Sequence, residues 1–207
     1  MKAILISIQP KWVEKILNGE KTIEIRKTIP KCDFPIDVYV YCTKSSIHDA
    51  LVVNSYGAKY MYAINRETAI PIGGYMGNGN VVAKFTLNKV EQICVFDNGS
   101  IQNWNYNDLE KSCLSYDEVS NYIGKGKTGY AWYIDNLQTF NFPMELSDFH
   151  KIGFSEELTD LESSQEDYIG MECYANHENV FDKLFKDLHQ EYCIKRPPQS
   201  YQYVEVE

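Results

Sequence analysis

The 207-residue sequence lacks several features that assign a chain to a class at once. No apolar run approaches the roughly 18 residues of a membrane-spanning helix, and the first residues, MKAILISIQP, lack the apolar core and cleavage site of a signal peptide. The six cysteines form no CxxC pair, which would indicate a zinc ribbon or a redox motif. We therefore expect a cytoplasmic protein with reduced thiols, no membrane association, no metal and no cofactor.

The sequence also lacks an excess of positive charge. Its net charge of −9 argues against indiscriminate binding to phosphate backbones, which requires a basic surface. The charge is uneven, because residues 1–31 carry seven Lys/Arg and three Glu, whereas residues 145–182 carry eleven Asp/Glu and one Lys. A nucleic-acid contact near the N-terminal region therefore remains compatible with the composition.

Residues 7–31, SIQPKWVEKILNGEKTIEIRKTIPK, carry the most informative pattern in the chain. Pro10 suits the first turn of a helix, and Gly19 suits a left-handed residue after its end, so we predict a helix over 10–18. A strand over 22–27 follows, in which Ile23 and Ile25 face one side while Thr22, Glu24 and Arg26 face the other. The polar side reads either as an ordinary solvated face or as the wall of a ligand cleft.

Gly19, Lys21, Glu24 and Arg26 fit GxKxxExR, and the chain thereby resembles the ASCH domain, a PUA-like family. The resemblance implies an α+β fold: a PUA-like mixed β-barrel with short flanking helices and the motif lining a cleft. The family is regarded mainly as a set of RNA-binding or nucleic-acid-associated modules. Some small members hydrolyse the acetyl amide of N4-acetylcytidine.

The rest of the chain is compatible with one domain over residues 1–207 that carries an acidic and helical excursion at about 145–195. Strands are predicted at 36–42, 81–90 and within GYAWYIDNLQTF, and Ser115 with Glu118 forms a capping box. The acidic segment 145–175 has weak periodicity and is interpreted as a linker or an exposed excursion. An amphipathic helix ending at Tyr192 and a closing strand within YQYVEV follow.

The favoured function is an RNA-binding or modified-nucleoside-binding module. Lys21 and Arg26 would contact phosphate or base edges, and Glu24 would accept a hydrogen bond from an exocyclic amine. Resemblance to longer family members suggests a further segment, residues 196–203, which would return to the barrel near the cleft. The candidate binding residues are Lys21, Glu24, Arg26, Trp132, Arg196 and Tyr201. Trp12 is the weakest aromatic candidate, because its helical position suits core packing.

Two alternatives remain open, and so does the question of whether the protein is an enzyme. In the hydrolytic relatives a lysine, a threonine and a distant glutamate are thought to act; Lys21 matches the lysine, but Glu24 stands in the threonine's place. Thr22 is a weak substitute, Glu118 is explained by its capping role, and a Lys21–Glu24 pair could support other acid–base chemistry. The other alternative is a protein-interaction adaptor that binds its partner through the acidic segment and the C-terminal helix.

Overall fold

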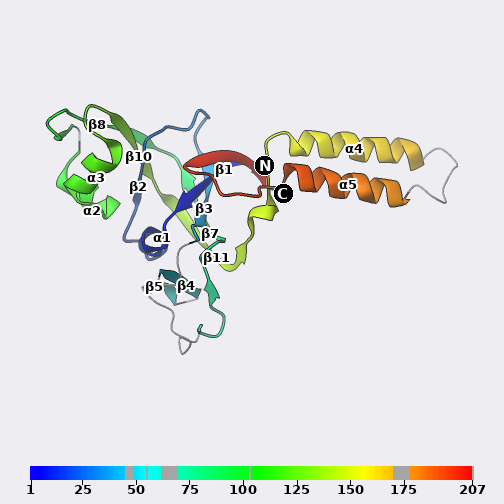
Figure 1. Ribbon diagram of the computed structural model, residues 1–207, viewed down its shortest axis with the longest axis horizontal. Coiled ribbons are helices and arrows are strands. Elements are labelled where there is room, and N and C mark those ends of the chain that lie inside the picture. The colour runs from blue at the N-terminus through cyan, green and yellow to red at the C-terminus, as the bar shows by residue number, and fades with distance from the viewer. Residues whose placement is uncertain (45–48, 55, 62–69, 103, 170–177, 207) are drawn as a thin grey trace.

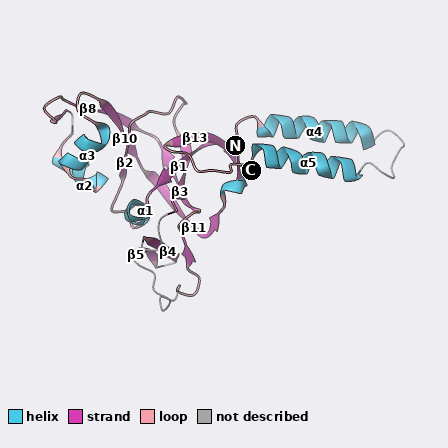
Figure 2. Ribbon diagram, in the orientation of Figure 1, coloured by secondary structure: helices cyan, strands magenta, loops and turns pink. Residues whose placement is uncertain are grey.

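The computed structural model describes residues 1–44, 49–54, 56–61, 70–102, 104–169 and 178–206, and it has an α+β fold (Figures 1 and 2). The described strands pair into three sheets. The largest sheet has the order β11 (Asp135–Met144), β7 (Val81–Leu87), β3 (Ile36–Cys42), β1 (Lys2–Ile8), β13 (Tyr201–Val206) and β12 (Phe149–His150). The second has the order β2 (Ile23–Arg26), β10 (Thr128–Tyr133), β8 (Val90–Val95) and β9 (Ile101–Gln102).

The third sheet has the order β5 (Gly57–Met61), β4 (Ala50–Asn54) and β6 (Tyr75–Met76). The described helices are α1 (Pro10–Leu17), α2 (Tyr106–Ser112), α3 (Tyr116–Ile123), α4 (Phe154–Ile169), α5 (Glu178–Tyr192) and a 3-10 turn, η1 (Leu146–Asp148). The pairings among the described strands do not include one that closes these sheets into a single barrel.

Strand β1 lies in the interior of the largest sheet, parallel to β3 and antiparallel to β13. Ile4 and Ile6 pack into one apolar cluster, whereas Ala3 and Leu5 pack into another on the opposite face. A strand that is buried on both faces needs a nearly continuous apolar run, which AILISI provides.

The helix and the alternating strand predicted for residues 7–31 are both present. Helix α1 begins at Pro10, and Gly19 follows it with a φ of +75°, which glycine adopts without a steric penalty. In β2, Ile23 and Ile25 pack with Val119 of α3 in a third apolar cluster. The opposite face of β2 is also buried, so Glu24 and Arg26 do not lie on a solvated surface.

The acidic segment forms a helix over residues 154–169, so of the two readings, a linker or an exposed excursion, the linker is wrong there. Helices α4 and α5 lie side by side and project away from the sheets (Figure 1). The carboxylate of Glu205 on β13 accepts hydrogen bonds from the backbone N–H groups of Gly153 and Ser155 at the start of α4. Tertiary contacts therefore stabilise a helix whose own sequence is weakly periodic.

Within the residues that the structure describes, no helix is long and apolar enough to cross a membrane.

Candidate functional site

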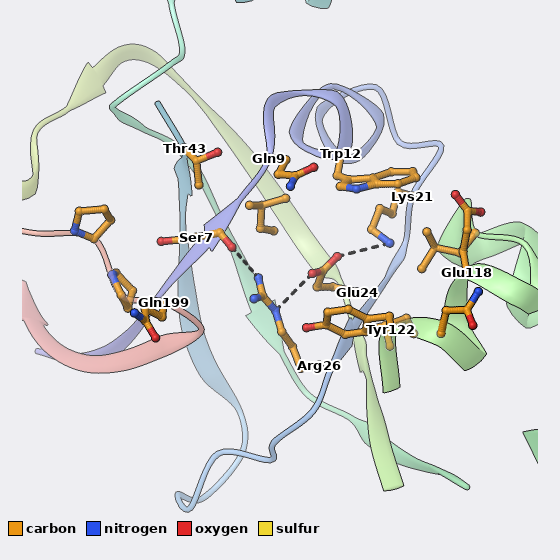
Figure 3. A pocket seen from close by; sticks show the side chains of 16 residues that line it. Ser7, Gln9, Trp12, Lys21, Glu24, Arg26, Thr43, Glu118, Tyr122 and Gln199 are labelled. Atoms are coloured by element: carbon orange, nitrogen blue, oxygen red, sulfur yellow. Dashed lines mark hydrogen bonds and ion pairs between the residues drawn. The ribbon is translucent and has the colours of Figure 1, made fainter. Parts of the chain in front are cut away.

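A cavity of about 760 Å³ opens between α1, β2, α3 and the segment that precedes β13 (Figure 3). Lys21, Glu24 and Arg26 of the predicted motif line it together. The other lining residues are Ser7, Ile8, Gln9, Trp12, Ile25, Thr43, Leu114, Glu118, Asn121, Tyr122, Pro197, Pro198 and Gln199. Its volume lies within the ordinary range for small-molecule sites.

The turn after α1 places Lys21 at the cavity. The carbonyl of Lys15 accepts hydrogen bonds from the backbone N–H groups of both Glu20 and Lys21, at 2.9 and 3.0 Å. The positive φ of Gly19 makes this reversal possible. Lys21 therefore enters the cavity from the turn, whereas Glu24 and Arg26 enter it from β2 (Figure 3).

The three motif side chains form a buried ion-pair network. Nζ of Lys21 lies 3.3 Å from Oε2 of Glu24, and Nε of Arg26 lies 3.2 Å from Oε1. The exposed fractions of Lys21, Glu24 and Arg26 are 2%, 9% and 5%. Charges this deeply buried are tolerated only when they are paired, and here one carboxylate lies between two cations.

Both cations are also bound to backbone carbonyls. Lys21 donates from Nζ to the carbonyl of Ser112, 2.6 Å away and 91 residues later in the chain. Arg26 donates from Nη2 to the carbonyl of Ser7 at 2.9 Å and from Nη1 to that of Ser200 at 3.5 Å. The network thus links β2 to the end of α2, to β1 and to the segment before β13.

Two buried polar atoms at the cavity have no hydrogen-bond partner among the described residues. They are Oγ of Ser7 and Nε of Arg26. The Arg26 Nε is close enough to Glu24 to form an ion pair, but its N–H is not aligned for a hydrogen bond. Neither atom is accessible to solvent, and the charge at Nε of Arg26 is balanced by the Glu24 carboxylate at 3.2 Å.

Helix α3 provides the wall that contains Glu118 and Tyr122. Glu118 completes the predicted capping box, accepting a 2.7 Å hydrogen bond from the backbone N–H of Ser115, and this bond lowers the pKa of the Glu118 carboxyl. Burial raises the pKa of the Tyr122 phenol, while the charge of Arg26 opposes that rise. At neutral pH the wall therefore presents one carboxylate and one protonated phenol.

Two aromatic rings at the cavity each lie near a lysine. Nζ of Lys11 is 4.4 Å from the ring centre of Trp12, and Nζ of Lys27 is 5.0 Å from that of Tyr122. In Figure 3 the two rings lie on opposite sides of Glu24. Rings next to cations are typical of surfaces on which bases stack and phosphates are neutralised.

The remaining sequence-predicted residues lie outside this set, since the described lining includes neither Thr22, Trp132, Arg196 nor Tyr201. Trp132 is completely buried, pairs in register with Glu24 and packs 5.4 Å from the ring of Tyr201. Tyr201 donates from its hydroxyl to the carbonyl of Ile29, and Arg196 is exposed. Thr22 precedes β2, and its backbone N–H donates to the carbonyl of Lys111.

Sequence reasoning missed several lining residues. Trp12, the weakest of the aromatic candidates, lines the cavity and also packs against the apolar core, whereas Tyr122 is not among the predicted residues. Pro197, Pro198 and Gln199 reach the cavity from the C-terminal segment, immediately after Arg196. A local signal existed only for Trp12, because its position about two turns before Gly19 places it beside the motif.

Within the described residues no group of three or more His, Cys, Asp and Glu side chains has the geometry of a metal site.

The chain is similar to crystal structures of ASCH from Zymomonas mobilis. The first has 15% sequence identity and a TM-score of 0.49, and the match covers 98% of this chain and 87% of that chain. Two variants of the same protein match with 16% and 14% identity, each with a TM-score of 0.48, over 99% and 98% of this chain and 91% and 88% of theirs. No protein-family model and no curated protein matches the sequence.

These crystal structures are of ASCH proteins, and residues 19–26 of this chain resemble the ASCH motif. At such identities and TM-scores the likeness gives no information about activity, so the cavity's own residues must indicate the function.

Proposed function

We propose that the cavity binds a nucleobase, either within RNA or as a modified nucleoside, and that the protein is a binding module. The observation that carries this proposal is the buried Lys21–Glu24–Arg26 network, which lines the cavity together with Trp12 and Tyr122. A base is planar and carries hydrogen-bonding groups along its edges. It therefore matches a cavity that has aromatic rings beside buried polar groups.

Each group at the cavity has a role in this proposal. Trp12 and Tyr122 offer faces for stacking, and Glu24 offers an acceptor to the base edge. Lys11 and Lys27, which lie near the two rings, would neutralise phosphates on either side of a bound base. The net charge of −9 is compatible with this, because the acidic residues are concentrated in the α4–α5 hairpin.

The finer description of the fold belongs to the same proposal. We infer that the sheets together form a PUA-like barrel, that residues 1–207 are one domain, and that the α4–α5 hairpin is an excursion from it. Two links support this: Arg26 joins β2 to β1, and Lys21 joins the turn before β2 to the end of α2.

The test is calorimetric titration of the whole protein with single-stranded RNA of mixed sequence and with free nucleosides. Glu24→Gln is expected to weaken binding at least about tenfold, because a charge-assisted hydrogen bond is lost. Glu205→Gln is the matched control, since Glu205 is also buried but does not line the described cavity. Equal weakening in both variants, or no binding to the unchanged protein, would contradict the proposal.

Hydrolysis of N4-acylated cytidine is the second candidate, and the 3.3 Å contact between Lys21 and Glu24 favours it. A lysine beside a carboxylate can shuttle a proton to a leaving amine while water attacks the amide carbon. Water and N4-acetylcytidine would give acetate and cytidine. Conversion detected by mass spectrometry and lost in Lys21→Ala would establish it, whereas no conversion by the folded protein would leave the binding module.

The adaptor alternative has one supporting observation. Val180 and Leu184, one turn apart on α5, are about half exposed on the projecting hairpin. A protein partner that depends on this surface would be lost in Val180→Ser and unaffected by Glu24→Gln.

A further inference from the structure

The carboxylate of Glu24 lies between two cations. A cation lies near each of its oxygens, with Lys21 at Oε2 and Arg26 at Oε1. The carboxylate therefore forms one ion pair through each oxygen. An ionised carboxylate accepts hydrogen bonds and cannot donate them.

The two cations also donate hydrogen bonds to backbone carbonyls. Lys21 is bound to the carbonyl of Ser112, and both terminal nitrogens of Arg26 are directed at the carbonyls of Ser7 and Ser200. Lys21 and Arg26 therefore act chiefly by positioning Glu24. The group on which both cations converge is the carboxylate, and it lines the cavity.

Glu24 retains acceptor capacity on both oxygens. A carboxylate has about four lone-pair sites, and one cation lies near each of its two oxygens. The remaining sites lie on neighbouring atoms of a group that lines the cavity. The two oxygens of the carboxylate are therefore complementary to two N–H groups that lie side by side on a planar ring.

We infer, on the basis of the proposed base-binding function, that this site selects a base edge with two adjacent N–H donors, as guanine presents with N1–H and its 2-amino group. Uracil places carbonyl oxygens beside its single N–H, and these would face the negative carboxylate. Cytosine and adenine each pair an amino group with a ring-nitrogen lone pair, which is also repelled. Hypoxanthine keeps the N1–H but lacks the second donor.

The discriminating experiment is calorimetric titration of the whole, unaltered protein with guanosine, inosine, cytidine and uridine. Guanosine is expected to bind about tenfold or more tightly than inosine, because inosine lacks one hydrogen bond to a charged acceptor. Cytidine and uridine are expected to bind more weakly than inosine. The same bases placed singly in a short oligonucleotide distinguish a free nucleoside from a base within RNA as the source of this edge.

Glu24→Gln provides the second measurement, since its amide has one acceptor and one donor and should abolish the preference for guanosine over inosine. The unaltered protein keeps the inference testable if this variant does not fold. Equal affinities for guanosine and inosine, or tighter binding of cytidine or uridine, would overturn the two-donor inference and leave the base-binding cavity standing. No binding of any base would remove the proposed function as well.

Discussion

Two buried glutamates, Glu24 and Glu205, show how the same side chain serves a cavity in one region and a helix in another. Glu24 is held between two cations and lines a cavity of about 760 Å³. Glu205 accepts three hydrogen bonds, from the N–H of Gly153 at 3.2 Å, the N–H of Ser155 at 2.7 Å and the hydroxyl of Ser155 at 3.0 Å. It has no place in the described lining of that cavity.

The difference lies in what satisfies the charge. Glu205 is satisfied by the start of α4, where backbone N–H groups would otherwise lack acceptors, so its carboxylate stabilises a helix. Glu24 is neutralised by side chains that the backbone holds in place, and part of its acceptor capacity stays directed at the cavity. A buried charge therefore indicates a binding site only when its own chain does not use all of its hydrogen-bonding capacity.

The largest expected effect comes from removing one cation of the Glu24 network. Lys21→Met should lower the free energy of unfolding by about 3–5 kcal/mol, because it leaves Glu24 with one partner and the Ser112 carbonyl without its donor. Urea denaturation monitored by circular dichroism measures this. The double variant Lys21→Met/Glu24→Gln should be more stable than the sum of the single effects implies, and strict additivity would argue against the network.

The next effect concerns the base of the hairpin. Phe154 is 1% exposed and stacks on the ring of His150 at 3.8 Å, so Phe154→Ala should cost about 3 kcal/mol. Hydrogen exchange should accelerate in α4 and α5, while nucleoside affinity at the cavity should not change. If nucleoside binding is lost together with the protection of α4 and α5 from hydrogen exchange, the cavity and the hairpin are coupled.

Glu205 gives a prediction with a defined pH direction. Burial alone would raise its pKa, but the hydrogen bonds from the Ser155 and Gly153 backbones outweigh this and lower the pKa. The stabilisation is therefore complete above the ordinary glutamate pKa of about 4.3 and is lost as the pH falls through the lower folded-state value.

Glu205→Gln should cost about 2 kcal/mol at pH 7 and should flatten the fall in melting temperature between about pH 5 and pH 2. Thermal melts of both proteins across this range measure the difference. An unchanged pH profile in the variant would contradict the assignment of this acid sensitivity to Glu205.

Tyr122 should affect ligand binding more than stability. Its side chain is 42% exposed, so Tyr122→Ala should change the free energy of unfolding by less than about 1 kcal/mol. Nucleoside affinity should fall about tenfold, because one stacking face is lost. Tyr106→Ala, which removes an exposed tyrosine outside the described lining, is the matched control.

The smallest effect is expected at Arg196. This side chain is exposed and lies outside the described lining, so Arg196→Ala should change nucleoside affinity by less than about twofold. A larger loss with RNA than with a nucleoside would place Arg196 on the path of the flanking phosphates.

Much of the local structure around the motif could be predicted from the sequence. Pro10 and Gly19 bracket α1, the strand predicted at 36–42 is β3, and the Ser115–Glu118 capping box begins α3. These predictions succeed because a helix start, a positive φ and an alternating strand depend on residues a few positions apart.

Helix α4 and most of the cavity could not be predicted in this way. The acidic run lacks a strong apolar stripe of its own, and α4 depends on α5 and on the Glu205 carboxylate some fifty residues later. Likewise, the cavity brings Trp12 together with Tyr122 and Gln199 from three separate segments.

The sequence by itself determined that Glu24 and Arg26 share one face of a strand, with Lys21 at its start, because side chains alternate along a strand. Only the tertiary structure decided that this face is buried, that Lys21 reaches the carbonyl of Ser112, and that Arg26 reaches those of Ser7 and Ser200. The reason is physical. Burial and long-range hydrogen bonds depend on segments that meet only in the folded chain, and no local pattern encodes which segments those are.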